Sequence, residues 1–281
     1  MSDADRHSDL GGGRTAYLER GSGEAIVFIH GVGLHSAVWR SQVDHFATRA
    51  RVVAYDTLGH GRSDLPPRDA TLEDYLAQLA DLLDVLEIPS AVLSGHSMGA
   101  MIATAFAATR PDRVHGLVAF NTVYRRSPEE RCSALERAEL LAREGSAATV
   151  DAAISRWFGE PIEPEDRGRA EDLHRWLLAA DPEGYARAYR VFATSDDAFA
   201  DQMGALTAPA LFVTGEFDPH STPAMSRALA AEASNARAVI LPGERHMFAY
   251  RSPGRASDLI SGFLAETGGA ATRAMPSGGA R

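Results

Sequence analysis

The segment from Ala91 to Ala103 constrains this chain more than any other. An apolar run is followed by the turn Gly95-His96-Ser97-Met98-Gly99 and then by small residues typical of a helix. A sharp strand-to-helix turn leaves no room for side chains two positions before and after its serine, and both positions are glycine. The segment therefore predicts a nucleophile elbow, which presents Ser97 at the C-terminal end of its strand. A plain glycine-rich turn with a buried serine is the alternative.

Apolar runs along the chain predict an α/β fold with a mostly parallel, twisted sheet. Nearly continuous apolar segments are typical of strands that are covered on both faces, and helices with one apolar face separate them. This alternation predicts right-handed βαβ units. The expected strands are residues 15–19, 24–29, 52–55, 91–94, 114–120, 210–214 and 238–241, and the main expected helices are 37–47, 72–86, 100–109, 223–233 and 256–264.

The alternation of strands and helices stops near Arg125 and returns near Leu206. The residues between them contain helical stretches and no convincing strand, so we expect a helical cap over residues 125–206. The core of the fold is then expected over residues 14–124 and 207–266. Residues 1–13 and 267–281 are rich in glycine and polar or small residues, and we expect both to be flexible tails.

Composition excludes some classes of partner. The 281 residues carry a formal net charge of −10, which argues against nucleic acid as a partner. Cys132 is the only cysteine, so no internal disulfide forms and a reducing compartment is favoured. No signal peptide and no apolar stretch of membrane-spanning length is visible. We expect a cytoplasmic protein that acts on a small molecule without a membrane partner, and the oligomeric state stays open.

A serine, an aspartate and a histidine occur in an order and at positions that suit nucleophilic catalysis. Ser97, Asp218 and His246 each follow a predicted strand, so all three are expected at one edge of the sheet. A serine needs an imidazole to take its proton, and the imidazole needs a carboxylate to fix its tautomer. We therefore predict Ser97 as nucleophile, His246 as general base and acid, and Asp218 as the orienting acid.

Other residues compete for these roles less well. His174 and His220 are the rival bases, but neither ends a strand. Asp196 and Asp197 lie at the end of the expected cap, and Asn121, which follows the strand at 114–120, has no carboxylate. We expect the two loop histidines at positions 30 and 60 to have structural roles.

The loop His30-Gly31-Val32-Gly33 follows a buried strand and predicts a second backbone donor for an oxyanion. We assign that donor to the Val32 amide, with Gly33 or Leu34 as alternatives, and the first donor to the Met98 amide. No metal-binding spacing, phosphate loop or dinucleotide fingerprint is present, so we expect no metal and no cofactor. The candidates for the substrate pocket are Leu34, Trp39, Trp157, Tyr189, Phe192 and Met247.

Taken together, these motifs resemble those of the α/β-hydrolase superfamily with a helical cap. The resemblance spans about residues 15–264. Within the superfamily the chain is most similar to the 3-oxoadipate enol-lactonase and small esterase group, whose members carry in a cap helix a pattern like that of Tyr185, Tyr189 and Phe192 in this sequence. This chain departs from that group with Arg245 before the histidine and Arg251 five residues after it. These arginines would attract a substrate carboxylate or pair with acidic residues nearby. The matching motifs are His30-Gly31, residues 56–63, Gly95–Gly99, Gly215–Asp218 and His246.

The resemblance and the residues together imply a cofactor-free serine hydrolase. The leading hypothesis is cleavage of a small carboxylic ester or lactone through an acyl-enzyme on Ser97. The same residues would also serve hydrolysis of a carbon–carbon bond in a diketone or ring-fission product, hydrolysis of an amide, or a perhydrolase side activity, and the fold does not choose among them. A receptor that has kept the pocket and lost turnover is the alternative outside enzymes.

Overall fold

One eight-stranded sheet forms the centre of the protein. The computed structural model describes residues 6–10 and 13–268, and in that part the strand order is β1-β2-β4-β3-β5-β6-β7-β8. Only the pairs β1–β2 and β2–β4 are antiparallel; the other pairs are parallel. The strands are β1 Arg6–Leu10, β2 Gly13–Arg20, β3 Ala25–Ile29, β4 Arg51–Tyr55, β5 Ala91–His96, β6 Val114–Phe120, β7 Ala210–Gly215 and β8 Ala236–Leu241.

Helices cover both faces of this sheet. Because right-handed crossovers lead from β3 outward to β4 and then back across β3 to β5, α1 lies on one face and α2, α3 and α8 on the other. Helix α10 returns to the first face, where it contacts α1. These helices are α1 Arg40–Phe46, α2 Leu72–Val85, α3 Met98–Thr109, α8 Pro223–Glu232, α9 Phe248–Arg251 and α10 Pro253–Thr267.

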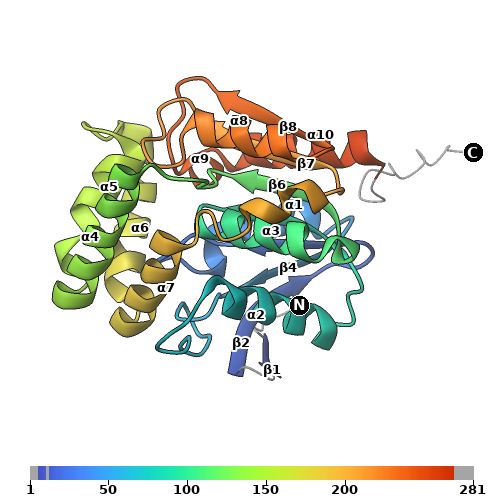
Figure 1. Ribbon diagram of the computed structural model, residues 1–281, viewed down its shortest axis with the longest axis horizontal. Coiled ribbons are helices and arrows are strands. Elements are labelled where there is room, and N and C mark those ends of the chain that lie inside the picture. Colours follow the sequence, from blue (N-terminus) through green and yellow to red (C-terminus); the bar gives the residue numbers. More distant parts are fainter. Residues whose placement is uncertain (1–5, 11–12, 269–281) are drawn as a thin grey trace, which may run out of the picture.

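A helical cap is inserted between β6 and β7, where the strand pattern is lost from the sequence. Figure 1 shows its helices, green to gold, stacked together beside one end of the sheet. Helix α4 packs along α7, and α5 packs against α6. The confirmed fold class is therefore an α/β sheet flanked by helices with an inserted cap. The cap helices are α4 Pro128–Glu144, α5 Val150–Phe158, α6 Arg167–Ala179 and α7 Pro182–Thr194.

The central strands are buried along their whole length. Every residue of β3, β5 and β7 is buried, which is the reason for their continuous apolar sequences. These strands are parallel, so their C-terminal ends meet at one edge of the sheet. The loops that follow β3, β5, β6, β7 and β8 therefore converge there, and the cap lies beside the same edge.

The N-terminal segment differs from the expectation of a flexible tail over residues 1–13. Residues Arg6–Leu10 form β1, which pairs antiparallel with β2 from Arg6 opposite Tyr17 to Leu10 opposite Gly13. The physical reason is that strand pairing uses backbone groups, so a polar segment can extend a sheet that offers an open edge. Gly13 likewise begins β2, and Thr267 ends α10 with Gly268 as its C-cap, so these predicted tail residues also belong to regular elements. The remaining tail residues, 1–5, 11–12 and 269–281, lie outside the described residues.

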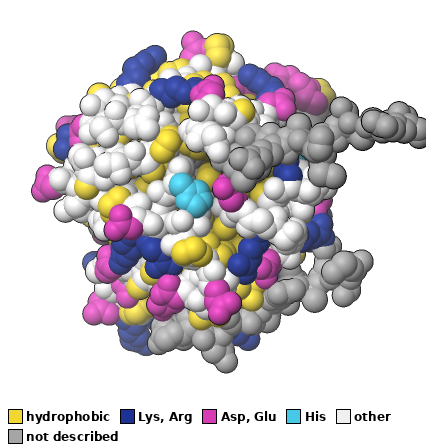
Figure 2. Space-filling view, turned by 90° about the vertical axis from the view of Figure 1, so that its right-hand side faces the viewer, with side chains coloured by type: hydrophobic (Ala, Val, Ile, Leu, Met, Phe, Trp, Pro, Cys, Tyr) yellow, Lys and Arg dark blue, Asp and Glu magenta, His cyan; other side chains and the backbone are white. Residues whose placement is uncertain are grey.

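Charged side chains of both signs are mixed on the face of the molecule away from the cap. Figure 2 shows basic and acidic side chains interspersed there, without a broad patch of one sign. Ion pairs at the surface of the described residues include that of Arg113 with Asp84. Across residues 6–10 and 13–268, no helix is both long enough and apolar enough to span a lipid bilayer.

Candidate active site

Ser97 lies in a strained turn at the C-terminal end of β5. Its backbone has φ 55° and ψ −115°, a conformation that residues other than glycine rarely adopt. The turn is possible only with glycine on each side: a Cβ on Gly95 would lie 2.2 Å from the Gly99 oxygen, and one on Gly99 would lie 2.2 Å from the Ile29 oxygen. The Ser97 N–H donates to the Phe120 oxygen at 2.9 Å. The core strands thus hold the serine in one position.

His246 and Asp218 come together at the same edge of the sheet. Asp218 follows β7 and His246 lies in the loop after β8. The Nδ1 atom of His246 donates to Oδ2 of Asp218 at 2.7 Å, and both side chains are almost completely buried. This hydrogen bond leaves Nε2 of His246 as the free nitrogen. Ser97 and His246 line one cavity, and their side chains share no hydrogen bond; such contacts often tighten only when substrate binds.

The carboxylate of Asp218 is held by hydrogen bonds at both oxygens. Oδ1 accepts the backbone N–H groups of His220 at 2.9 Å and Ser221 at 3.0 Å, and Oδ2 accepts an N–H of the Asn121 side chain at 2.7 Å. Burial alone would raise the pKa of Asp218, but the facing His246 and the backbone N–H groups of His220 and Ser221 lower it to about 2. Asp218 is therefore ionised and fixed in orientation near neutral pH.

Asn121 is a site residue that was not predicted from the sequence. It directly follows β6, which lies between β5 and β7, so its side chain reaches Asp218 across one strand spacing. An amide side chain at this position excludes an orienting acid, but it does not exclude a hydrogen-bond donor. Its place at a strand end beside the other site residues was the available signal. Its backbone has φ 55°, a conformation that asparagine tolerates better than most residues.

The loop after β3 leaves one free backbone donor next to Ser97. The Gly33 N–H donates to Nε2 of His60 at 2.8 Å, and the Leu34 N–H donates to the Gly31 oxygen at 3.1 Å. Both alternative oxyanion donors are therefore engaged elsewhere. Within the part of the chain that the structure describes, no acceptor faces the amide of Val32, and Val32 lines the cavity together with Ser97.

Two buried neutral histidines hold this loop. Nε2 of His30 accepts the Thr57 N–H at 2.9 Å, and its Nδ1 donates to the Gly31 oxygen at 2.8 Å. His60 likewise accepts through Nε2 from Gly33 and donates through Nδ1 to the Leu58 oxygen at 3.0 Å. Burial lowers the pKa of His30 to about 4 and that of His60 to about 3. Both rings thus fix the loop geometry.

His96, next to Ser97, supports the backbone of His246. Its Nε2 atom donates to the His246 carbonyl oxygen at 2.9 Å, and the two rings meet edge to face at 4.9 Å. Burial lowers the pKa of His96 to about 3, so the ring is neutral near neutral pH. His96 is therefore not in a position to act on Ser97 itself.

The cavity above Ser97 is enclosed by the cap. The core contributes Val32, Ser97, His220 and His246, and the cap contributes the aromatic wall. The ring of Trp157 stacks on that of His246 with centroids 6.0 Å apart. Of the predicted pocket residues, Trp157, Tyr189 and Phe192 line this cavity, together with Tyr185 and Leu141.

Three predicted pocket residues lie elsewhere. Leu34, Trp39 and Met247 do not line the cavity; all three are buried in the main hydrophobic core. Trp39 packs its ring against Phe28 at 5.0 Å and Phe120 at 6.2 Å. These residues lie near the site loops in sequence, but their apolar side chains point into the hydrophobic core. Burial in the core removes their apolar surface from water, which stabilises the fold.

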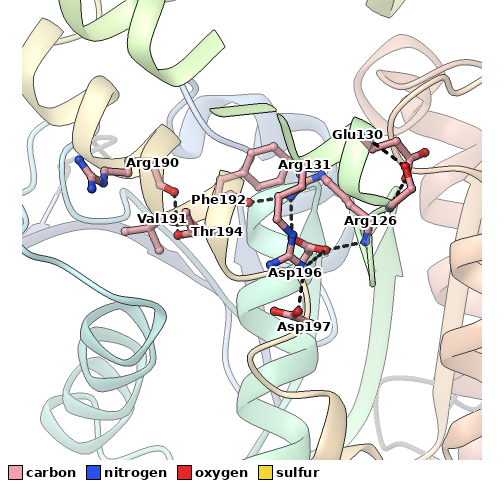
Figure 3. Close-up of polar contacts among 10 residues, drawn as sticks. Arg126, Glu130, Arg131, Arg190, Val191, Phe192, Thr194, Asp196 and Asp197 are labelled. Carbon is pink, nitrogen blue, oxygen red and sulfur yellow. Dashed lines mark hydrogen bonds and ion pairs between the residues drawn. The ribbon is translucent and has the colours of Figure 1, made fainter. Parts of the chain in front are cut away.

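Three of the rival acids and bases, His174, Asp196 and Asp197, have partners elsewhere. The fourth, His220, lines the cavity, and its buried Nε2 has no hydrogen-bond partner among the described residues. His174 bonds to Asp151 on the surface of the cap. Asp196 is completely buried and forms an ion pair with Arg126 at 3.2 Å, and Arg131 also reaches Asp196 and the neighbouring Asp197 (Figure 3). The backbone N–H of Arg126 donates to the same Asp196 carboxylate at 2.6 Å. These acids therefore join the start of the cap to its end.

Arg245 and Arg251 also lie outside the cavity. Arg251 forms ion pairs with Asp166 at 2.5 Å and with Glu244 at 2.8 Å. The Arg245 guanidinium lies over the Phe217 ring, 5.9 Å from its centre. Of the two roles expected for Arg251, the structure shows pairing with nearby acidic residues. The arginines that do line the cavity are Arg126, Arg137 and Arg156, none of which was predicted from the sequence.

The cavity combines a free backbone donor, a strained serine and a histidine–carboxylate pair, an arrangement that can perform acyl transfer. The described residues contain no group of three or more His, Cys, Asp or Glu side chains that could hold a metal ion. The alpha/beta hydrolase fold family matches residues 24–253, and the chain therefore belongs to this family.

Three similar proteins illustrate its range. The chain is 34% identical over 259 residues to an (E)-2-((N-methylformamido)methylene)succinate hydrolase of Acinetobacter baylyi, covering 92% of this chain and 97% of that one. It is 30% identical to 3-oxoadipate enol-lactonase 1 of the same organism, covering 70% of this chain and 73% of that one. The crystal structure of an enol-lactonase from Burkholderia xenovorans matches with a TM-score of 0.86 and 28% identity, over 92% of this chain and all of that one. The resemblance to the enol-lactonase group is confirmed.

Proposed function

We propose that this protein is a cofactor-free serine hydrolase that forms an acyl-enzyme on Ser97. His246 takes the proton of the serine hydroxyl through Nε2 while the serine oxygen attacks the substrate carbonyl. The Val32 and Met98 amides stabilise the negative oxygen that forms, and Asp218 stabilises the charged imidazole. When the carbonyl reforms, the bond to the leaving group breaks and His246 returns the proton to that group.

Water completes the cycle in the second half of the reaction. His246 takes a proton from a water molecule, whose oxygen attacks the acyl carbon bound to Ser97. The bond to the serine oxygen then breaks, and the proton passes from His246 back to that oxygen. One acid is released and the enzyme is restored, so no oxidant, metal or cofactor enters the balance.

The observation that carries this proposal is the fixed pair of His246 and Asp218 at the cavity that contains Ser97. The 2.7 Å hydrogen bond through Nδ1 leaves only Nε2 for proton transfer, and four hydrogen bonds in all hold the carboxylate. Burial of an ionised group beside a strained serine costs stability, and this combination of strain and perturbed pKa is typical of catalytic sites.

The proposed substrate is a small ester or lactone, in agreement with the enol-lactonases that the chain resembles. An amide is the second candidate, and one comparison favours it. The hydrolase of Acinetobacter baylyi that aligns with this chain over 97% of its own length is named for a substrate with an N-methylformamido group. Amide cleavage needs the same attack by Ser97 but depends more on His246 as the acid, because an amine leaves poorly without a proton.

A labelling experiment tests the serine mechanism. We expect a fluorophosphonate probe to label the wild-type protein, which should also hydrolyse 4-nitrophenyl acetate. The Ser97→Ala variant should lose labelling and at least about 10³-fold of the activity, because it has no nucleophile. Ser257→Ala, which changes a buried serine in α10 away from the cavity, is the matched control and should keep both. A folded wild-type protein without labelling or turnover would overturn the proposal, as would an active Ser97→Ala variant.

A further inference from the structure

Arginines gather on the cap side of the cavity. Arg126 lies just before α4, Arg137 lies within α4 and Arg156 within α5, and all three side chains line the cavity that also contains Ser97. A cavity that places three guanidinium groups around a small volume is positively charged unless acidic residues balance it. The partners of each arginine therefore decide which charge a ligand meets.

Arg126 is balanced by the protein itself. Its guanidinium forms an ion pair with buried Asp196 at 3.2 Å and donates to the Phe192 oxygen at 3.0 Å. Figure 3 shows the side chains of Arg126 and Asp196 pointing toward each other. This arginine therefore has a structural partner and leaves no net charge for a ligand.

Arg137 and Arg156 have no such balance. No carboxylate in the described residues forms an ion pair with either of them. Nε of Arg137 donates to the Tyr189 hydroxyl at 3.2 Å, and Nε of Arg156 is buried without a hydrogen-bond partner. Burial lowers the pKa of the Arg156 guanidinium, and the neighbouring Arg137 lowers it further. Arg137 and Arg156 therefore line one cavity, and no carboxylate of the described residues balances either charge there.

Such an arrangement is unfavourable in the absence of an anion. A buried donor without an acceptor costs about 1–3 kcal/mol, and two guanidiniums in a poorly solvated site repel each other. A planar carboxylate would accept hydrogen bonds from both and balance their charge, which is the recognition that arginine performs best. The surface residue Arg143 on α4 shows the contrast, since it pairs with Glu144.

We propose that Arg137 and Arg156 form a carboxylate-binding subsite, so that the substrate of this enzyme carries a carboxylate group apart from its scissile carbonyl. The inference rests on the proposed function only in naming the bound molecule as the substrate. The core side of the cavity holds Ser97 and His246, whereas the arginines come from cap helices. The subsite therefore selects the substrate and orients its carbonyl toward the core.

Kinetics with two matched esters test the selection. Mono(4-nitrophenyl) adipate carries a free carboxylate, and its methyl ester has nearly the same shape without the charge. In the wild-type protein we expect kcat/KM to be at least about tenfold higher for the charged ester. Arg137→Gln and Arg156→Gln should each lower this ratio about tenfold, mainly through KM of the charged ester. Arg156→Lys should lie between, because it keeps the charge and loses the planar fork.

The control variant is Arg143→Gln, which removes an exposed arginine from α4 and should keep the wild-type ratio. A wild-type enzyme that cleaves both esters equally well would overturn the subsite. An unchanged ratio in both arginine variants would do the same, since their role would then be structural.

Binding without turnover separates this inference from the proposed function. In the Ser97→Ala protein, calorimetry should detect binding of adipate that is lost when Arg156→Gln is added and weakened by salt. If adipate binds in this way but the wild-type protein is not labelled by fluorophosphonate, the subsite stands and the hydrolase proposal fails. If the wild-type protein is labelled and adipate binding is the same with and without Arg156, the hydrolase proposal stands and the subsite fails.

Discussion

At the scale of single residues, Asn121 contributes one hydrogen bond to the carboxylate that faces His246. Removing a donor from a buried ionised group costs about 1.5–3 kcal/mol, so Asn121→Gly should lower kcat about tenfold or more. Asn121→Ala should lower kcat equally but should also be less stable than the glycine variant by up to about 1 kcal/mol, because the backbone at this position has φ 55°. Steady-state kinetics and urea unfolding measure the two effects, and wild-type activity in both variants would contradict the positioning role.

At the scale of elements, the junction of β5 and α3 depends on close contact with β3. Gly99→Ala would place a Cβ 2.2 Å from the Ile29 oxygen, a backbone atom that cannot move away without shifting the strand. We expect a loss of about 4 kcal/mol or more in the free energy of unfolding, or an insoluble protein. Gly262→Ala in α10 is the matched control: no atom lies within 4 Å of its added Cβ, and helix propensity should raise stability by about 0.5–1 kcal/mol. Urea unfolding of the purified variants makes the comparison, and a stable Gly99→Ala protein would contradict it.

The loops after β3 and β4 are joined by neutral histidines, which makes the stability of the fold depend on pH. His30, His60 and His96 take up protons below about pH 6.5 in the unfolded chain, but only near pH 4 or pH 3 in the folded protein. Between these values the unfolded state binds more protons, so stability rises with pH and is lost as pH falls from 6.5 toward 4. Each histidine contributes up to about 1.4 kcal/mol per pH unit.

Urea unfolding at pH 7, 6 and 5 measures this slope. In His60→Gln the dependence of the unfolding free energy on pH should decrease by up to about 1.4 kcal/mol per pH unit, which corresponds to one proton. The variant also loses hydrogen bonds to the loop, but that loss does not depend on the titration of His60. An identical slope in the variant and in the wild-type protein would show that His60 is not among the groups responsible.

At the scale of the whole molecule, the features that can be predicted from the sequence are those encoded locally. A buried parallel strand needs a continuous apolar run, and the loops after such strands meet at one edge, so the amino-acid order alone is enough to expect Ser97, Asp218 and His246 together. The charged wall of the cavity depends on how α4 and α5 pack on the core. A residue such as Arg137, in a helix with many exposed charges, gives no local sign of which face it occupies. The pairing of β1 with β2 likewise follows from an open sheet edge and not from an apolar pattern in β1.

The cap leaves the core and returns to it at almost the same place. The Arg125 N–H donates to the Asp196 oxygen at 3.0 Å, and the neighbouring Arg126 forms the buried ion pair with the Asp196 side chain. The intervening helices therefore form a closed cassette whose two ends touch. Because the cap joins the core at a single place, changes within its helices need not alter the geometry of the sheet or its loops. The cap side of the cavity wall can therefore vary while Ser97 and His246 keep their positions in the core.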